Sequence, residues 1–229
     1  LWELACRVFS LPATVLPTPP AIAKAMVQYW PAIWENSLQT LMTTLLGFAL
    51  AIVFGLALGI GIGWSKFIYG ALYPVMIAFN AIPKVAVVPI LIIWFGIGTI
   101  PAIFTAFLIS FFPIVVNVAT GLATTEPELQ DVLRALGASK LDIVRKVGIP
   151  RSMPYFFGSL KVAITLAFVG SVVSETIGAN SGLGQMMLAA QAGFNVELVF
   201  AGVMALAILG IALYAITALI EKRFTGWAF

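Results

Sequence analysis

Long stretches without a charged residue constrain this chain more than any other feature. The three longest are 36–65, 85–125 and 198–220, which contain 30, 41 and 23 residues. A helix needs about 20 predominantly apolar residues to cross the hydrocarbon core of a bilayer. These stretches therefore predict a chain that crosses a membrane several times.

The composition supports the same conclusion. Of the 229 residues, 62% are apolar and 9% are charged, whereas an ordinary soluble domain is about 45–50% apolar and about 25% charged. So few charges cannot hydrate the surface of a folded chain of this size, because much of a soluble protein's surface has to be polar. The bilayer is therefore the expected solvent.

Several kinds of chemistry are excluded at this stage. The chain has no His, so imidazole cannot serve as a catalytic base or as a metal ligand. Its single cysteine, Cys6, excludes internal disulfides and clustered thiolate metal sites. The net charge of +3 comes from basic residues placed in loops rather than on one solvated face, which argues against nucleic acid as a partner. We expect no metal site and no catalytic site.

We expect an all-α, polytopic transmembrane bundle, because a membrane-spanning backbone has to satisfy its polar groups internally and barrel strands would show alternating ten-residue segments. Gly96, Gly98 and Pro101 divide the 41-residue stretch into two crossings. Residues 1–36 are interpreted as the end of a first helix followed by a proline-containing external connector. Five complete spans are predicted at 37–63, 69–95, 100–122, 154–177 and 198–220.

The basic residues predict the orientation, because cytoplasmic loops carry an excess of Lys and Arg. If the five spans alternate, eight of the 12 basic residues fall on one side, which we assign to the cytoplasm. The opposite side then carries 31–36, 96–100 and 178–197. The eight residues are Lys66, Arg134, Lys140, Arg145, Lys146, Arg151, Lys222 and Arg223.

The loop 126–151 is unusual, because it holds nine of the chain's 21 charges. Its pattern predicts a short helix, a turn at Gly137, a second short helix capped by Ser139, and a stop at Pro150. Both pieces carry an apolar stripe, with Leu133 on the first and Val147 on the second. An interfacial helix lying in the headgroups is one interpretation, but such helices favour an excess of basic residues. The balanced charge favours docking into the groove of a partner protein.

The spacing of Asp131-Val132-Leu133, Gly137, Val147 and Ile149-Pro150 resembles the cytoplasmic EAA loop of binding-protein-dependent ABC importer permeases. Further motifs resemble the nitrate, sulfonate, taurine and pyrimidine-precursor branch of that family, in the same order along nearly the whole chain. These motifs are Leu16-Pro17-Thr18-Pro19, Ile82 to Pro89, Ile93 to Gly98, Ser174-Glu175 and Ser181 to Gly184.

The resemblance implies one permease domain, 1–229, that forms the translocation path for a small, anionic or heterocyclic solute in the bacterial inner membrane. It implies a homodimer, two ATP-binding subunits that carry ATP and Mg, and an extracytoplasmic solute-binding protein. The chain has no Gly-x-x-x-x-Gly-Lys phosphate loop, so it would bind no nucleotide itself. The expected ATPase-coupling residues are Glu128, Asp131, Val132, Leu133, Arg134, Gly137, Ala138, Ser139, Val147, Ile149 and Pro150.

Polar residues inside the expected spans are candidates for the translocation path, because ionisable groups at that depth are costly. Lys84 lies between two prolines whose irregular backbone has to face protein or a wet cavity. Glu175 either braces the 180–184 loop or faces the vestibule that receives solute; both interpretations stand. Isolated polar residues also serve as interhelical hydrogen bonds. The candidates are Asn80, Lys84, Asn117, Ser171 and Glu175.

Small residues recur every fourth position along one face of the first complete span: Gly47, Ala51, Gly55, Gly59 and Gly63. This spacing predicts close helix packing, against either the same chain or a second copy. Two other function classes remain open. A secondary transporter would be expected to carry several intramembrane ionisable groups, and an intramembrane enzyme would need paired carboxylates or a base beside a nucleophile.

Overall fold

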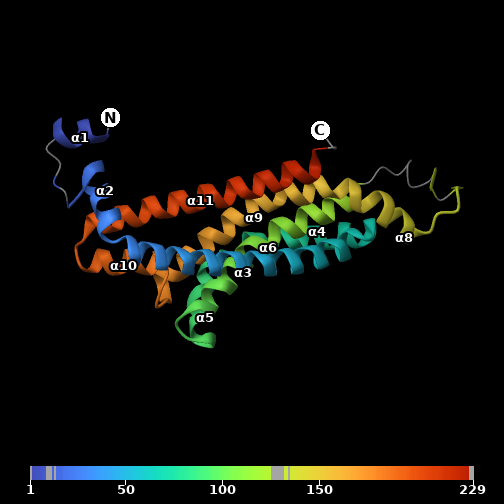
Figure 1. The fold of residues 1–229 in the computed structure, drawn as a ribbon. Coiled ribbons are helices and arrows are strands. Elements are labelled where there is room, and N and C mark those ends of the chain that lie inside the picture. Colours follow the sequence, from blue (N-terminus) through green and yellow to red (C-terminus); the bar gives the residue numbers. More distant parts are fainter. Residues whose placement is uncertain (1, 9–11, 13, 125–131, 134, 227–229) are drawn as a thin grey trace.

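The computed structural model describes residues 2–8, 12, 14–124, 132–133 and 135–226, and the secondary structure in this part is helical (Figure 1). The all-α expectation is confirmed. The elements are α1 (Trp2–Val8), α2 (Pro19–Gln28), α3 (Trp30–Gly63), α4 (Lys66–Ala81), η1 (Lys84–Val87), α5 (Val88–Phe95), α6 (Thr99–Ala123), α8 (Lys140–Ile143), η2 (Val144–Gly148), α9 (Ile149–Gly178), α10 (Leu183–Ala192) and α11 (Val196–Thr225).

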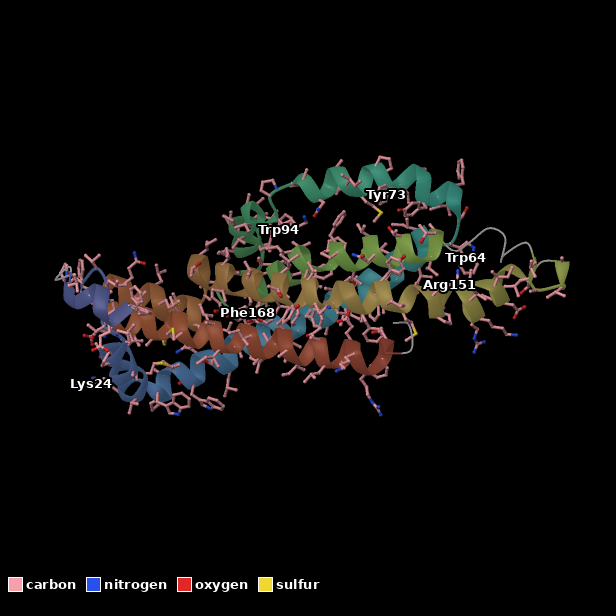
Figure 2. All side chains as sticks on the ribbon, turned by 90° about the horizontal axis from the view of Figure 1, so that it is seen from above. Lys24, Trp64, Tyr73, Trp94, Arg151 and Phe168 are labelled. Atoms are coloured by element: carbon pink, nitrogen blue, oxygen red, sulfur yellow. The ribbon has the colours of Figure 1, made fainter. Side chains whose placement is uncertain are left out.

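Four long helices form the bundle, and each is apolar and long enough to cross a membrane: α3, α6, the helix that includes α9, and α11. The bent pair of α4 with η1 and α5 passes the same test of length and apolarity only when its two pieces are taken together, as a broken span or a re-entrant loop. The four long helices run side by side in both views (Figures 1 and 2). Trp64 and Arg151 lie at one end and Lys24 lies at the other (Figure 2). We call these the hairpin end and the α10 end, after the elements found there.

The glycine face of α3 packs against α6 of the same chain. A Cβ built on Gly55 would lie 2.8 Å from Ile114 Cβ, and one on Gly59 would lie 2.7 Å from Val118 Cβ. Gly63 meets Leu122 in the same way. The contacts advance together along both helices, so α3 and α6 are parallel and in register. Glycine is required here because any larger residue would push the two backbones apart.

The second expected span, 69–95, is not one straight helix. α4 ends at Ala81, and the chain turns by 70° before η1 and α5 continue. Pro83 explains the break, because proline lacks the N–H that a continuing helix would need and restricts the residue before it to extended backbone. Ile82 has that extended conformation, with ψ at 127°.

Two segments expected to be loops contain helices. α2 begins with Pro19 and Pro20 in its first turn, where a missing N–H costs nothing. α10 follows Gly182 inside the expected loop 178–197, with Leu183, Met186 and Ala190 buried on one face. Both helices pack with the start of α11 around Ile22, Ile33 and Ala201. The α10 end is therefore a small apolar core of its own.

Candidate functional site

The hairpin end is built on an extension of α9. α8, the π-turn η2 and α9 follow one another without a gap from Lys140 to Gly178. Ile143 is 5% exposed, and Gly148 lies against Leu122 of α6, where an added Cβ would come within 3.2 Å of the leucine side chain. The second half of the hairpin is thus fixed to the body of the bundle.

The turn of the hairpin has the local structure that the sequence predicts. Gly137 has a φ of 84°, a left-handed conformation that glycine adopts without strain. The Asp142 backbone N–H donates to Ser139 Oγ at 3.2 Å, and the Ser139 backbone N–H donates to Asp142 Oδ2 at 3.3 Å. This reciprocal pair caps the start of α8. The candidate residues Glu128, Asp131 and Arg134 lie outside the described residues.

Apolar side chains of the hairpin are left exposed. Val132 is 58% exposed, Leu136 is 78% exposed and Leu141 is 62% exposed. Beside them is a hollow of about 240 Å³ lined by Leu133, Leu136, Gly137, Ala138, Asp142, Ile143, Lys146 and Val147. Val147 is half-buried and Ile149 is 40% exposed. The described part of the hairpin is a projection with an apolar surface, which suits a groove on another protein.

Lys84 and Asn80 form a second site at the bend between α4 and α5. Lys84 Nζ donates to Asn80 Oδ1 at 2.9 Å and to the Asn80 carbonyl oxygen at 3.2 Å. It also lies 5.5 Å from the ring centroid of Phe112, halfway along α6. These hydrogen bonds use two of the three N–H donors of an ammonium group. The side chain caps the free carbonyl at the end of α4 and keeps a positive charge at the middle depth of α6.

Glu175 is at the centre of a third polar cluster, at the α10 end. It is 1% exposed. Its Oε2 atom accepts from Thr40 Oγ1 at 2.9 Å and from the Gly184 backbone N–H at 3.1 Å, and Oε1 accepts from Thr43 Oγ1 at 3.3 Å. Thr43 also contacts Ser171. We call Glu175, Thr40, Thr43, Ser171 and Gly184 the Glu175 clip, because it joins α3, α9 and α10.

Two more contacts extend the clip along the start of α10. The Gly182 N–H donates to Asn36 Oδ1 at 2.8 Å, and the Leu183 N–H donates to Thr40 Oγ1 at 2.9 Å. Three successive N–H groups at the helix N-terminus, which have no partner within a helix, are thereby satisfied by side chains of other helices. A Cβ on Gly182 would collide with the Glu175 carboxyl group. This geometry supports the bracing interpretation of Glu175.

The five path candidates make their hydrogen bonds in three separate groups. Asn80 and Lys84 are together at the bend, and Ser171 and Glu175 are together in the clip. Asn117 makes its hydrogen bond within α6, from Nδ2 to the Pro113 carbonyl oxygen at 2.8 Å, one turn back on its own helix. Asn36 and Thr40 were not recognised as site residues, although they lie on the same face of α3 as the glycines.

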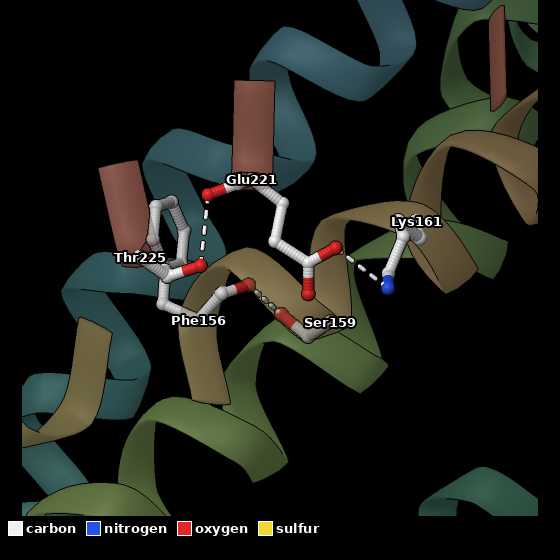
Figure 3. A network of polar contacts seen from close by, with 5 residues as sticks. All are labelled: Phe156, Ser159, Lys161, Glu221 and Thr225. Atoms are coloured by element: carbon white, nitrogen blue, oxygen red, sulfur yellow. Dashed lines mark hydrogen bonds and ion pairs between the residues drawn. The ribbon is translucent and has the colours of Figure 1, made fainter. Parts of the chain in front are cut away.

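Lys161 has a partner that the sequence reading did not identify. Its Nζ atom lies 2.6 Å from Glu221 Oε2, so the pair joins α9 to α11 near the hairpin end (Figure 3). The Thr225 hydroxyl donates to the Glu221 carbonyl oxygen at 2.8 Å. The pair could have been predicted from the order of the spans, because two antiparallel neighbouring spans bring a residue near the start of one beside a residue near the end of the next.

The chain was compared with known proteins. Residues 51–226 match the family described as "Binding-protein-dependent transport system inner membrane component". The formylaminopyrimidine transport permease protein ThiX of Halalkalibacterium halodurans is 31% identical, over 99% of this chain and 91% of its own length. The taurine transport system permease protein TauC of Escherichia coli is 27% identical, over 85% of this chain and 71% of its own length.

A solved structure has the same fold. An inward-facing conformation of the MetNI methionine ABC transporter matches with a TM-score of 0.73 and 22% sequence identity. The match covers 86% of this chain and 98% of that one. The likeness therefore extends over most of the bundle.

Proposed function

The chain belongs to the family of binding-protein-dependent transport system inner membrane components, and from that premise we propose that its hairpin end couples it to ATP-binding subunits. The protein is a multi-pass inner-membrane permease subunit of an ABC importer, a transport subunit and not an enzyme. A permease without a phosphate loop needs its energy from another polypeptide. The hairpin is the part of the chain best suited to receive it.

The exposed apolar surface of the hairpin carries this proposal. Leu141 projects from a capped helix that continues into α9, and Leu136 lies just before the Gly137 turn that leads into it, so a partner that moves the hairpin also moves a membrane-spanning helix. Exposed apolar surface outside the expected spans is stabilised by burial in a groove. We assign the hairpin end to the cytoplasm because the excess of Lys and Arg lies at that end.

The proposed assembly contains two copies of this chain, two ATP-binding subunits and an extracytoplasmic binding protein. ATP and Mg bind the ATP-binding subunits in this scheme. Closure of those subunits around ATP moves the two hairpins, and the spans tilt to face outward. Hydrolysis resets the inward-facing state. The hairpin supplies coupling because it makes different contacts with its partner in the two states.

For the path, we propose that Lys84 and Asn80 lie beside the solute, which is small and anionic or heterocyclic. A half-buried cation over an aromatic ring provides charge and a flat apolar face together. Relatives named for formylaminopyrimidine and taurine transport are consistent with such a solute.

Replacing Lys84 by Met should reduce uptake more than assembly of the complex. Uptake at the wild-type rate would remove Lys84 from the path.

The coupling proposal is tested by affinity purification of the tagged chain, followed by ATPase and uptake assays. Wild-type chain should bring an ATPase with it. Gly137→Pro should leave membrane insertion intact and uncouple ATP hydrolysis from uptake, because proline cannot adopt the left-handed φ of the turn. Lys222→Glu, at the same end but on α11, is the matched control. Uptake that persists without any ATPase would favour a secondary transporter instead.

A further inference from the structure

α10 is attached to the body of the protein by polar contacts as well as by apolar packing. The N–H groups of Gly182, Leu183 and Gly184 donate to Asn36, Thr40 and Glu175 respectively. Asn36 and Thr40 belong to α3, and Glu175 belongs to α9. The start of α10 is therefore fixed to two membrane-spanning helices at the same point.

The backbones also approach closely at this point. A Cβ on Gly184 would lie 2.5 Å from the Val172 carbonyl oxygen and 2.9 Å from Glu175 Cβ. Leu183 is fully buried in the apolar core of the α10 end, with Ile33 and Ala201. The start of α10 therefore cannot shift relative to α9 without displacing the Glu175 side chain.

α9 connects this point to the hairpin. Glu175 and Ile149 are both on α9, and at 1.5 Å per residue they are about 39 Å apart along the helix axis. Ile149 directly follows η2, which joins α8. One continuous helix therefore has the proposed ATPase contact at one end and the Glu175 clip at the other. A helix of this kind transmits displacement, because its backbone hydrogen bonds resist compression and stretching.

We propose that the Glu175 clip transmits movement of α9 to α10, so that the nucleotide state of the ATPase subunits is expressed in α10 at the opposite end of the bundle. Glu175 is a positioning residue in this scheme. It acts by holding the start of α10 and contacts neither solute nor nucleotide. The inference rests on the proposed attachment of the hairpin to ATPase subunits.

The test is hydrogen–deuterium exchange on the complex of this chain with its copurified ATPase subunits in lipid nanodiscs. The complex is compared without nucleotide and after trapping with ATP and orthovanadate. In the wild type, trapping should change the exchange of residues 141–160 and of residues 183–192. In Glu175→Gln, the change at 141–160 should persist and the change at 183–192 should be lost. The Gly184 amide should also exchange roughly tenfold faster in both states, because its acceptor is weakened.

Ser174→Ala is the matched control. Ser174 is 1% exposed, one residue before Glu175, and its hydroxyl is outside the clip. It should keep both nucleotide-dependent changes. A role in folding alone would alter exchange equally in the two states, without removing the response of α10. If Glu175→Gln does not assemble, Thr40→Val decides by the same measurement, because it removes the acceptor of the Leu183 N–H and keeps the side-chain shape.

The inference would be overturned if α10 in Glu175→Gln responded to trapping as it does in the wild type. If Glu175→Gln does not assemble, the same result in Thr40→Val would overturn it. A wild-type complex whose α10 does not respond to trapping would overturn it too. Neither result would affect the proposed function, provided that the ATPase is present and the hairpin responds. A wild-type chain that retains no ATPase would instead remove the proposed function itself, and the inference with it.

Discussion

The two ends of the bundle differ in what they bury and what they expose. At the α10 end, polar groups are enclosed: Glu175, Thr40 and Thr43 are each 1% exposed or less, and their partners come from three helices. At the hairpin end, apolar groups are exposed, with Leu136 at 78% and Leu141 at 62%. Both arrangements are costly for a chain on its own, since buried polar groups need partners and exposed apolar groups need cover.

The difference shows which of the two features is complete within one chain. The chain itself supplies every partner that the Glu175 carboxyl group uses, so the Glu175 clip needs no second protein. The hairpin end is rigid through Gly148 and α9, yet presents its apolar residues outward. Mutations should therefore damage stability at the first end and association at the second. The predictions below test this separation, beginning with the largest expected effect.

Glu175→Ala should destabilise the folded protein by roughly 3 kcal/mol, because it removes a buried side chain and leaves the Gly184 N–H without its acceptor, while the Thr40 and Thr43 hydroxyls keep only backbone acceptors on α3. The measurement is thermal unfolding of the detergent-purified chain, followed by size-exclusion chromatography with fluorescence detection. Ser174→Ala is the control and should remain within about 0.5 kcal/mol of the wild type. Equal unfolding temperatures for the two variants would contradict the assignment of the clip.

Leu136→Ser should weaken binding of the ATPase subunit by roughly 10- to 100-fold, because burying a leucine contributes about 1.5–3 kcal/mol. Stability of the isolated chain should not change, since the side chain is already exposed. The affinity is measured by biolayer interferometry on nanodisc-embedded protein. Leu188→Ser, on an exposed position of α10, should bind the ATPase normally. A hairpin that only lies in the headgroups would give the same affinity for both variants.

Ser139→Ala should cost about 1 kcal/mol in the stability of α8, the usual contribution of a helix cap. The Asp142 N–H loses its acceptor, and the first turn of α8 should fray. Amide exchange of residues 140–143 should rise about fivefold, while ATPase affinity falls by less than tenfold. Ser159→Ala, on α9, is a control whose hydroxyl bonds only within its own helix at Phe156. Unchanged exchange at 140–143 would show that the cap is dispensable.

Lys161→Met should have the smallest effect, below about 1 kcal/mol, because partly exposed ion pairs contribute little. The pair joins α9 to α11 at 2.6 Å, but both side chains reach solvent or headgroups. Unfolding of Lys161→Met should occur within a few degrees of the wild type. A decrease of more than about 2 kcal/mol in the free energy of unfolding would mean that this ion pair is as important for stability as the Glu175 clip.

Periodicity and charge were enough to predict the helical bundle and the hairpin turn. Each of these depends on one local rule: apolar length for a span, proline and glycine for a break, Ser139 for a cap. The glycine spacing of α3 predicted close packing but left the partner open, and the structure identifies α6 of the same chain. These features follow from residues near one another in sequence. The expected stop at Pro150 was wrong: the helix runs on from α8 and η2, and Pro150 lies in the first turn of α9.

Bracing of the 180–184 loop by Glu175 was one of two open interpretations, but the α3 members of the clip could not be predicted, because they come from distant positions. Thr40 and Glu175 are 135 residues apart, and Asn36 and Gly182 are 146 residues apart. Helix α10 was also missed. It has only ten residues and lies in a stretch that contains Gly and Asn, so without knowledge of its buried partners the pattern predicts a loop. The 70° bend had a visible cause in Pro83, but its angle depends on packing against α6.

The parallel register of α3 and α6 limits which parts of the bundle can rearrange. Each glycine of α3 admits one Cβ-bearing residue of α6, so an axial slip smaller than a helical turn, about 5.4 Å, would place a side chain against a side chain. A smooth piston stroke between these two helices is excluded by their shape. During the transport cycle α3 and α6 should therefore move as one unit, and rearrangement should occur between this unit and the other helices.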